Sequence, residues 1–435
     1  MTVARLLPRF REAYRALDGF AARETWSRAD IARYQLARLN QTWRHAVDHV
    51  PYYRDLAARR RLPPQFAGLD EFVGCVPLLP KSLVRDRPQG LLSAVADRGR
   101  WKVTSGSTGV RTRTFWSHEA HRESLRGRYR FLDAWGVDVF DRCVMLWGDR
   151  TRFLPLSRRI PARVGRFVQD RLRRRLRLAV DRLDRPTLQG HLRRMVRFQP
   201  TVLYAYSTAA YVLAREALES GLRCESLRLV ILTAEVAAPH MIETVGRAFN
   251  VPAVMEYGSV ECGFLAGEHP DRLLRTRDDL ALIETLPRPD GRYDVVVTVL
   301  GNPSFPLLRY LIGDTTDAPL HVPAHGLSVL RGMIGRQHDC LVTQGGSLVH
   351  SAPILFVLDD PAIRRFLARQ RLDGSVHVLV EAGPAPAALD VTRITRRLQG
   401  IVGFPVTLEQ VTELPPTDSS KNRPVVSDLA ASRAS

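Results

Sequence analysis

The chain has 435 residues and a formal net charge of +19, with 45% hydrophobic and 25% charged residues. This composition is typical of a globular protein of about two to three domains. No apolar run approaches the roughly 18 residues that span a bilayer, and the five isolated cysteines indicate neither a disulfide framework nor a zinc cluster. Because Arg and Glu interrupt the apolar residues at the N-terminus, a signal peptide is not predicted and we expect a cytoplasmic protein.

The excess of positive charge fits nucleic acid, an anionic membrane surface, or a polyanionic small molecule such as ATP or coenzyme A. Lysine is rare in this basic chain. The three lysines are Lys81, Lys102 and Lys421, and all other residues counted as Lys or Arg are arginines. A compact ammonium and a planar guanidinium are not interchangeable at a binding site. A lysine that persists in an arginine-rich chain is therefore mildly informative.

Residues 9–60 have helical spacing, and we expect these helices to end near His49–Tyr53. Between residue 101 and about residue 330, short apolar runs alternate with amphipathic segments, which predicts an α/β fold with a largely parallel sheet. The predicted strands are Cys143–Trp147, Val202–Tyr206, Leu229–Thr233 and Tyr293–Leu300, the last of which alternates and also fits an antiparallel or β-barrel-like part. The predicted helices are Ser207–Ser220, with Ser207 as N-cap and Gly221 as stop, and Ala237–Phe249.

The texture of the sequence changes near Gly335. A strand at Ser375–Glu381, a helix at Ala388–Gly400 and a strand at Pro405–Val411 predict a compact α+β unit. We therefore predict a large N-terminal domain at 1–334 and a small, mobile C-terminal lid domain at 335–435.

The densest basic stretch runs from Ser157 to Arg185. Its apolar residues recur at helical spacing, which predicts an amphipathic helix with a solvated arginine face. A patch for nucleotide phosphates and a contact with an anionic surface are the alternatives. Aromatic residues hardly interleave with these arginines, which argues against a stacking platform for single-stranded nucleic acid.

A short run of hydroxyl residues and glycines carries the strongest local signal: Thr104, Ser105, Gly106, Ser107, Thr108 and Gly109. Glycines allow positive φ and close approach of the backbone, so several N–H groups can converge on phosphate oxygens. The run lacks the Lys of a Walker P-loop. An ordinary Ser/Gly surface turn is the alternative.

Two further motifs suit a nucleotide. In Tyr257-Gly258-Ser259-Val260-Glu261, the aromatic ring can stack on a nucleobase and the acid can bind Mg²⁺. In the segment 309–314, Asp314 can accept hydrogen bonds from both ribose hydroxyls. Taken alone, the first motif also fits a strand end with a core tyrosine and a surface glutamate. The second is weak alone because Gly-Asp pairs occur in most chains.

Two more segments are weak signals when taken alone: 335–339 with Arg336, and 414–421 with Lys421. Gly-Arg pairs occur in most chains, and a lone lysine near the C-terminus is usually solvated. Cys262, Glu268 and His269 lie close in sequence, but their spacing does not predict a metal site beyond Mg²⁺.

The order and spacing of these motifs resemble the adenylate-forming superfamily of acyl-CoA synthetases, adenylation domains and luciferases. The resemblance extends from about residue 35 to residue 430. The phenylacetate–CoA ligase-like branch, with its CapK-type capsule-biosynthesis relatives, fits best. Segments similar to that branch are Ala46–Arg54, Pro80–Arg85, Tyr206–Thr208 and Thr233–Glu235.

The resemblance implies a role for each motif. The loop Thr104–Gly109 would hold the β- and γ-phosphates of ATP, and Glu261 would hold Mg²⁺. The adenine would be lined by Ala234 and Glu235 and stacked by Tyr257 beside Gly258. Asp314 and Arg336 would bind the ribose. Lys421 would be the catalytic cation, between the substrate carboxylate and the α-phosphate.

The expected activity is ATP-dependent formation of an acyl-AMP from a carboxylic acid, aromatic in this branch, followed by transfer to coenzyme A. Several positions depart from the family pattern: Val110-Arg111 after the loop, Leu311 before Gly313, His338 at the hinge and Ser420 before Lys421. The alternatives are a non-CoA acceptor, namely an amine, a carrier protein or a phenolic hydroxyl that receives AMP, and a non-catalytic basic surface-binding protein. The expected partners are a small-molecule acid, coenzyme A or another acyl acceptor, and a second copy if the chain forms a homodimer, with no nucleic acid.

Overall fold

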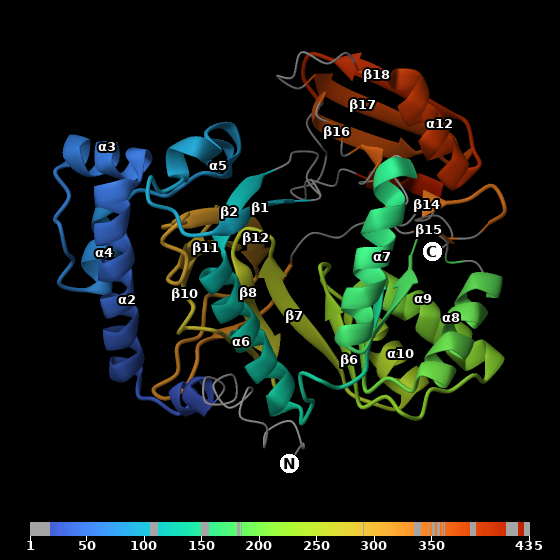
Figure 1. The fold of residues 1–435 in the computed structure, drawn as a ribbon, viewed down its shortest axis with the longest axis horizontal. Helices are drawn as coiled ribbons and strands as arrows, with labels where there is room; N and C mark the ends of the chain where they lie inside the picture. The colour runs from blue at the N-terminus through green and yellow to red at the C-terminus, as the bar shows by residue number, and fades with distance from the viewer. Residues whose placement is uncertain are drawn as a thin grey trace. The chain divides into compact units, whose positions relative to one another are not determined.

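The computed structural model describes residues 18–104, 112–148, 156–180, 183, 185–289, 291–334, 341–346, 348–349, 353–354, 357–358, 360, 362–382, 389–414 and 425–429. The chain divides into two compact units. Unit 1 consists of Met1–Thr104, Thr112–Val139 and Met255–Gly335, and unit 2 consists of Ser105–Arg111, Phe140–Val254 and Arg336–Ser435. Figure 1 labels their elements.

The N-terminal part of unit 1 is helical. Helix α2 (Arg28–His49) begins after Ser27, whose hydroxyl accepts a hydrogen bond from the Asp30 N–H, and α3 (Pro51–Arg60) begins at a proline whose φ suits a first helical turn. Helix α2 ends at His49 as predicted, but the expectation that helical structure stops near His49–Tyr53 is wrong, because α3 begins at Pro51 and continues to Arg60. The other helices of this unit are α4 (Leu69–Cys75), α5 (Lys81–Asp86), the 3₁₀ turn η2 (Pro88–Leu91) and α6 (His118–Ala134).

The strands of unit 1 pair antiparallel. A hairpin joins β1 (Gly99–Val103) to β2 (Arg113–Ser117), and a three-stranded sheet contains β10 (Ala281–Pro287), β11 (Tyr293–Val299) and β12 (Tyr310–Thr316). The predicted strand at Tyr293–Leu300 is thus β11, in the antiparallel arrangement. A further row runs in the order β13 (Val329–Leu330), β9 (Leu274–Thr276), β8 (Gly263–Glu268) and β7 (Ala253–Ser259). One hydrophobic core, with Trp43, Tyr53 and Phe305 fully buried, joins the helices to these strands.

In unit 2, four parallel strands lie in the order β6 (Leu229–Thr233), β5 (Val202–Tyr206), β3 (Cys143–Trp147), β4 (Arg175–Ala179). The three strands predicted here have the predicted bounds. Their helices are α7 (Leu156–Leu172), α8 (Arg185–Phe198), α9 (Ser207–Ser220) and α10 (Pro239–Phe249). The prediction of Ser207 as N-cap is wrong by one residue, because Tyr206 is the cap and Ser207 begins the helix.

The prediction of one amphipathic helix between Ser157 and Arg185 is wrong beyond Leu172. The chain turns at Arg173 and Arg174, where Arg174 has φ of 50°, and then forms β4 beside β3. The segment 175–179 alternates Arg with Leu or Ala, so its apolar residues fit a strand period as well as a helix period. Pairing with β3 selects the strand.

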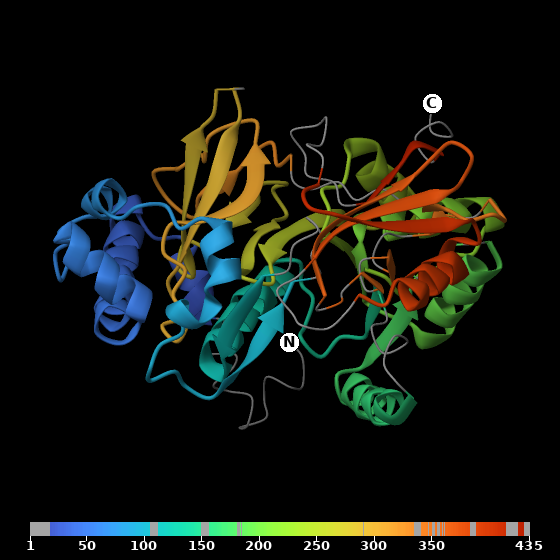
Figure 2. The same ribbon diagram turned by 90° about the horizontal axis from the view of Figure 1, so that it is seen from above.

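The C-terminal residues contain β14 (Leu341–Val342), β15 (Leu348–Val349), and a sheet in the order β18 (Val406–Val411), β17 (Val376–Ala382), β16 (Ile363–Gln370), β19 (Val425–Ser427). Helix α12 (Val391–Val402) covers one face of this sheet, as Figures 1 and 2 show, and packs into a core of its own with Phe366, Val378 and Leu398. The division of the chain at 334/335 into two functional domains stays a prediction. Among the described helices, none is long and apolar enough to cross a membrane.

Candidate functional site

Two of the predicted nucleotide-binding residues meet in unit 1. The phenol of Tyr257 on β7 donates a hydrogen bond to Oδ2 of Asp314 on β12 over 3.1 Å, although 57 positions separate them in the sequence. Both side chains are half-buried, so each has one side that solvent can reach. The structure therefore places the aromatic ring and the carboxylate of the two motifs in one location.

A glycine lies next to each of the two residues and allows a backbone geometry that other residues could not adopt. A Cβ at Gly258 would lie 2.3 Å from the carbonyl oxygen of Gly263, where β7 and β8 shift register. Gly313 has φ of 85°, which L-residues rarely adopt, and lies in the part of β12 where the pairing with β11 shifts. The Tyr-Gly and Gly-Asp pairs of the sequence thus have a physical cause in these two strand irregularities.

The predicted Mg²⁺ ligand, Glu261, is 4% exposed and paired with a lysine. Its Oε1 lies 3.0 Å from the Nζ of Lys81, the first residue of α5, and accepts a hydrogen bond from the hydroxyl of Tyr310 at 3.4 Å. Lys81 also donates to the carbonyl of Ile312 at 3.4 Å, two residues before Asp314 on β12. No motif in the sequence predicts a role for Lys81 or Tyr310. The rarity of lysine was the signal that pointed to Lys81.

Glu261 offers a carboxylate, the type of ligand that Mg²⁺ prefers, and its role as the Mg²⁺ ligand stays a prediction. Mg²⁺ at nucleotide sites is held by one or two carboxylates together with phosphate oxygens and water, so a full cage of side chains is not needed. Across the described parts of the chain, no group of three His, Cys, Asp or Glu side chains could hold a metal ion. In this structure Lys81 supplies the positive charge beside the carboxylate.

The neighbouring side chains of Cys262, Glu268 and His269 are buried, and their contacts are those of a folded core. Glu268 accepts a hydrogen bond from the Met255 N–H at 2.9 Å and pairs with Arg272 at 2.8 Å. Burial, and then the charge of Glu261, raise the pKa of the Cys262 thiol well above its usual range. A protonated thiol is a poor metal ligand.

The hairpin β1–β2 carries the predicted phosphate loop. Thr104 and Thr112 close its base: the Thr104 N–H donates to the Thr112 carbonyl at 3.0 Å, and the Thr104 hydroxyl accepts from the Thr112 N–H at 2.9 Å. Thr104 therefore fixes the entry to the loop in this structure. The predicted residues Ser105, Gly106, Ser107, Thr108 and Gly109 lie outside the described residues.

Lys102, on the strand that leads into this loop, is half-buried. Its Nζ lies 4.0 Å from the centroid of the Trp116 ring and 3.2 Å from Nδ1 of His121. Burial, with a smaller effect of Arg100, lowers the pKa of Lys102 to about 8. The lysine is thus held by an aromatic face at the start of the loop.

The predicted adenine-lining turn belongs to unit 2. Glu235 is buried, and its Oε2 accepts hydrogen bonds from the N–H of Thr208 at 3.0 Å and from its hydroxyl at 2.7 Å. The hydroxyl of Ser207 donates to the Glu235 carbonyl at 2.9 Å. A carboxylate at the first turn of α9 satisfies helix N–H groups and complements the helix dipole, so Glu235 stabilises the turn after β6.

Ala234, beside Glu235, has φ of 67°, a left-handed conformation that costs a non-glycine residue about 1–2 kcal/mol. Such strain concentrates at functional sites. The adenine-lining role of Ala234 and Glu235 stays a prediction. Arg336 and Lys421 lie outside the described residues.

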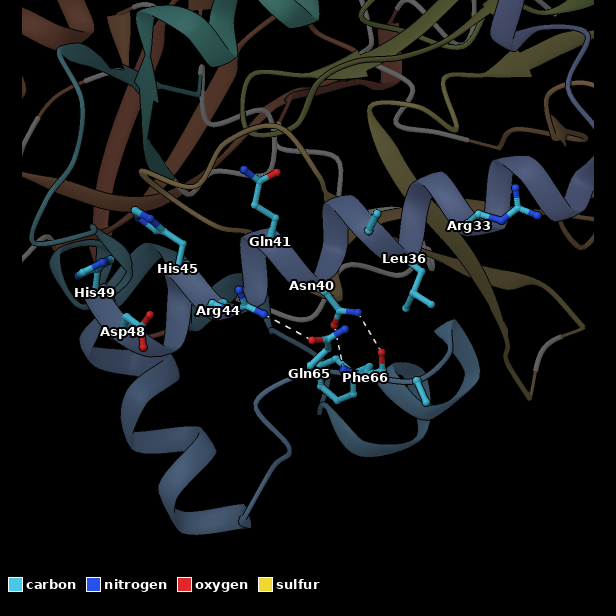
Figure 3. A pocket seen from close by; sticks show the side chains of 12 residues that line it. Arg33, Leu36, Asn40, Gln41, Arg44, His45, Asp48, His49, Gln65 and Phe66 are labelled. Atoms are coloured by element: carbon cyan, nitrogen blue, oxygen red, sulfur yellow. Dashed lines mark hydrogen bonds between the residues drawn. The ribbon is translucent and has the colours of Figure 1, made fainter.

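A groove of about 690 Å³ runs along α2, and Figure 3 shows the side chains that line it. Asn40 contributes to it but is engaged with the backbone of Phe66, donating to its carbonyl at 2.9 Å and accepting from its N–H at 2.8 Å. Asp48 and His49 of the segment Ala46–Arg54 line this groove, but none of the residues predicted to bind the nucleotide or Mg²⁺ does. It is therefore separate from the candidate site.

The chain resembles known proteins in both sequence and fold. The chain is 24% identical over 256 residues to protein CapK of Staphylococcus aureus, and the match covers 57% of each chain, so it spans little more than half the length of that relative. It superposes on a 2-hydroxyisobutyryl-CoA ligase in complex with 2-HIB-AMP and CoA, with a TM-score of 0.62, 18% identity, and coverage of 95% of this chain and 93% of the ligase. The chain has the adenylate-forming fold.

The same ligase in its postadenylation state, in complex with 2-HIB-AMP, gives a TM-score of 0.58 at 19% identity, over 95% of this chain and 92% of the ligase. No family model matches the chain. The adenylate-forming fold confirms the resemblance predicted from the motifs, and it confirms the predicted class of a large α/β part with a smaller C-terminal α+β part.

Proposed function

We propose that this chain activates a carboxylic acid with ATP, forming an acyl-AMP and pyrophosphate, and then transfers the acyl group to coenzyme A. The observation that carries the proposal is the hydrogen bond between Tyr257 and Asp314 in a chain of adenylate-forming fold. It joins the two residues that suit a nucleobase and a ribose. Glu261 and Lys81 adjoin the same strand through Tyr310 and Ile312.

In this proposal the nucleoside lies against Tyr257 and Asp314. The Tyr257 ring stacks on adenine while its hydroxyl holds the Asp314 carboxylate, which accepts hydrogen bonds from the ribose hydroxyls together with Arg336. Ala234 and Glu235 line the adenine, and Thr104–Gly109 surround the β- and γ-phosphates. Mg²⁺, held by Glu261 and the phosphates, would draw charge toward the departing pyrophosphate.

The first half-reaction joins two anions. A carboxylate oxygen bonds to the α-phosphorus, the bond from that phosphorus to the bridging oxygen breaks, and pyrophosphate leaves. Lys421 is proposed to lie between the carboxylate and the α-phosphate, where a compact ammonium lowers their repulsion in the transition state. Its loss should reduce the rate on the order of 10²–10³-fold, as for removal of one oxyanion-hole donor.

In the second half-reaction the coenzyme A thiolate attacks the acyl carbonyl and AMP leaves. The likeness to a CoA ligase along 95% of this chain supports coenzyme A over other acceptors. We propose that residues 335–435 move between the two half-reactions, as lid domains do. His338 stands where the family pattern has the hinge acid, so the transfer to coenzyme A needs a test separate from that of adenylation.

Acid-dependent exchange of labelled pyrophosphate into ATP, measured across a panel of aliphatic and aromatic acids, tests the first half-reaction. Consumption of coenzyme A with the acid that supports exchange tests the second. Exchange without coenzyme A consumption would leave an amine, a carrier protein or a hydroxyl as acceptor. ATP binding without exchange, for every acid, would exclude the adenylation proposal.

A further inference from the structure

Helix α7 exposes its apolar face. The large apolar side chains of this helix that are exposed follow a spacing of three and four residues and form one stripe: Ile160 (60% exposed), Val164 (58%), Phe167 (65%), Val168 (50%) and Leu172 (77%). A surface helix of a globular protein normally buries such a stripe against the core. We call these five residues the α7 stripe.

The opposite side of α7 faces the protein with polar groups. Asp170 is mostly buried and pairs with Arg177 of β4 at 2.7 Å. Arg166, which lies near Asp170 on the helix surface, is only half-exposed. The helix is therefore attached through its polar edge and directs its apolar edge outward, which is the reverse of the usual orientation.

Arginines accompany the stripe. Residues 156–174 include seven arginines and a single acidic residue, Asp170, which is already paired with Arg177. Arg163, Arg171, Arg173 and Arg174 are exposed, and the guanidinium of Arg171 lies 5.9 Å from the Phe167 ring centroid. An exposed apolar stripe beside strong positive charge is the signature of a helix that lies in the interface of an anionic bilayer.

We propose that α7 docks the protein on an anionic lipid surface, with the α7 stripe among the acyl chains and the arginines among the headgroups. A second copy of this chain is a poor occupant, because two stripes in contact would bring the exposed Arg163, Arg171, Arg173 and Arg174 of both copies close together. Seventeen residues give a helix of about 25 Å, too short to span the hydrocarbon core, so α7 would lie parallel to the membrane plane. Figure 1 labels the helix.

Co-sedimentation with phosphatidylcholine vesicles, with and without phosphatidylglycerol, tests this proposal on the full chain. The wild-type protein should sediment with the anionic vesicles and remain in solution with the neutral ones, and salt should weaken the binding. The double variant Val164→Asp/Phe167→Asp should lower the bound fraction by about tenfold or more, since both side chains would face hydrocarbon. Arg163→Glu should bind more weakly and with a smaller dependence on salt.

The matched control is Leu372→Asp, which places the same acid at another exposed apolar position, 67% exposed, in the turn after β16. It should bind vesicles as the wild type does. An unchanged melting temperature in each variant would show that the fold is intact. The proposal is overturned if anionic vesicles do not bind the wild type, or if the double variant binds as well as the wild type. It is equally overturned if the stripe mediates self-association or duplex DNA binding without vesicle binding.

Discussion

The ammonium of Lys81 lies 3.0 Å from a carboxylate oxygen of Glu261, the acid predicted to meet Mg²⁺. Lys81 is 23% exposed and Glu261 only 4%, so the pair is mostly shielded from water. A buried carboxylate without a cation is costly. The lysine therefore stabilises the folded protein by neutralising the charge of Glu261, and substitution can separate this structural role from the proposed role of Glu261 in binding Mg²⁺.

Lys81→Met should lower the free energy of unfolding by about 2–4 kcal/mol, because Glu261 would remain buried and unpaired. Glu261→Gln should cost less, since the ammonium of Lys81 is nearer to solvent. The double variant Lys81→Met/Glu261→Gln should recover part of the lost stability. Chemical denaturation measures all three free energies.

Pyrophosphate exchange by the same double variant distinguishes the roles of Glu261. We expect exchange to stay at least about tenfold below wild type although stability recovers, because an amide is a weaker Mg²⁺ ligand than a carboxylate. Recovery of exchange together with stability would assign Glu261 to the fold alone.

The contact between Tyr257 and Asp314 predicts a nucleotide-binding defect. Asp314→Ala should raise the KM for ATP in the exchange reaction by about tenfold or more, since at least one hydrogen bond to a charged group is lost. Tyr257→Phe keeps the ring and should raise it about threefold, whereas Tyr257→Ala also removes stacking and should have a larger effect. Tyr293→Phe, on β11, is the matched control and should leave KM unchanged. An Asp314→Ala enzyme with a normal KM for ATP would remove this residue from the ribose site.

We expect Glu235 to contribute mainly to the stability of the folded protein. Glu235→Gln should lower the free energy of unfolding by about 1–2 kcal/mol, because a charged acceptor at the first turn of α9 is replaced by a neutral one. Thr208→Val, which removes the hydroxyl hydrogen bond but keeps the N–H bond, should cost less, and the two costs should not be additive because both changes weaken the contact with the same carboxylate. Glu219→Gln, an exposed acid on the same helix, should be neutral. A loss of ATP binding by Glu235→Gln at unchanged stability would instead indicate direct contact with the nucleotide.

Much of the fold could be predicted from the sequence because its signals are local. The strands β3, β5 and β6 are short apolar runs bounded by turn residues, and the glycine after Ser220 stops α9 in a left-handed conformation. The segment 175–179 could not be assigned in this way, because its Arg-Leu alternation fits both periods and only the neighbouring β3 selects the strand.

The candidate site was less predictable because it depends on tertiary contacts. The motif residues Tyr257 and Asp314 were predicted from their chemistry, but their hydrogen bond requires the strand irregularities at Gly258 and Gly313. Lys81 meets Glu261 because α5 lies beside β12, and no local pattern encodes that contact.

His269 should make unit 1 sensitive to acid. Burial lowers the pKa of its imidazole from 6.5 to about 4. Between these values the unfolded chain binds the proton and the folded chain does not, so stability falls as the pH is lowered through this window. The loss should reach about 3 kcal/mol at pH 4. His269→Gln should flatten the dependence in denaturation curves between these pH values, whereas His321→Gln, at an exposed position, should not. An identical acid limb in the wild type and His269→Gln would contradict the assignment.

Lys421 should act in one half-reaction. Lys421→Ala should lower acyl-AMP formation on the order of 10²–10³-fold and leave much of the conversion of synthetic acyl-AMP to thioester. Lys421→Arg should also fail in adenylation, because the planar guanidinium does not replace a compact ammonium. Equal loss in both half-reactions would contradict the assigned role.

The most direct test of the central claim is the incorporation of labelled pyrophosphate into ATP by the purified wild-type chain in the presence of Mg²⁺. We predict incorporation that requires one class of organic acid and that falls on the order of 10²–10³-fold in Lys421→Ala. The absence of acid-dependent incorporation with every acid tested, in a protein that is folded and binds ATP, would contradict the account.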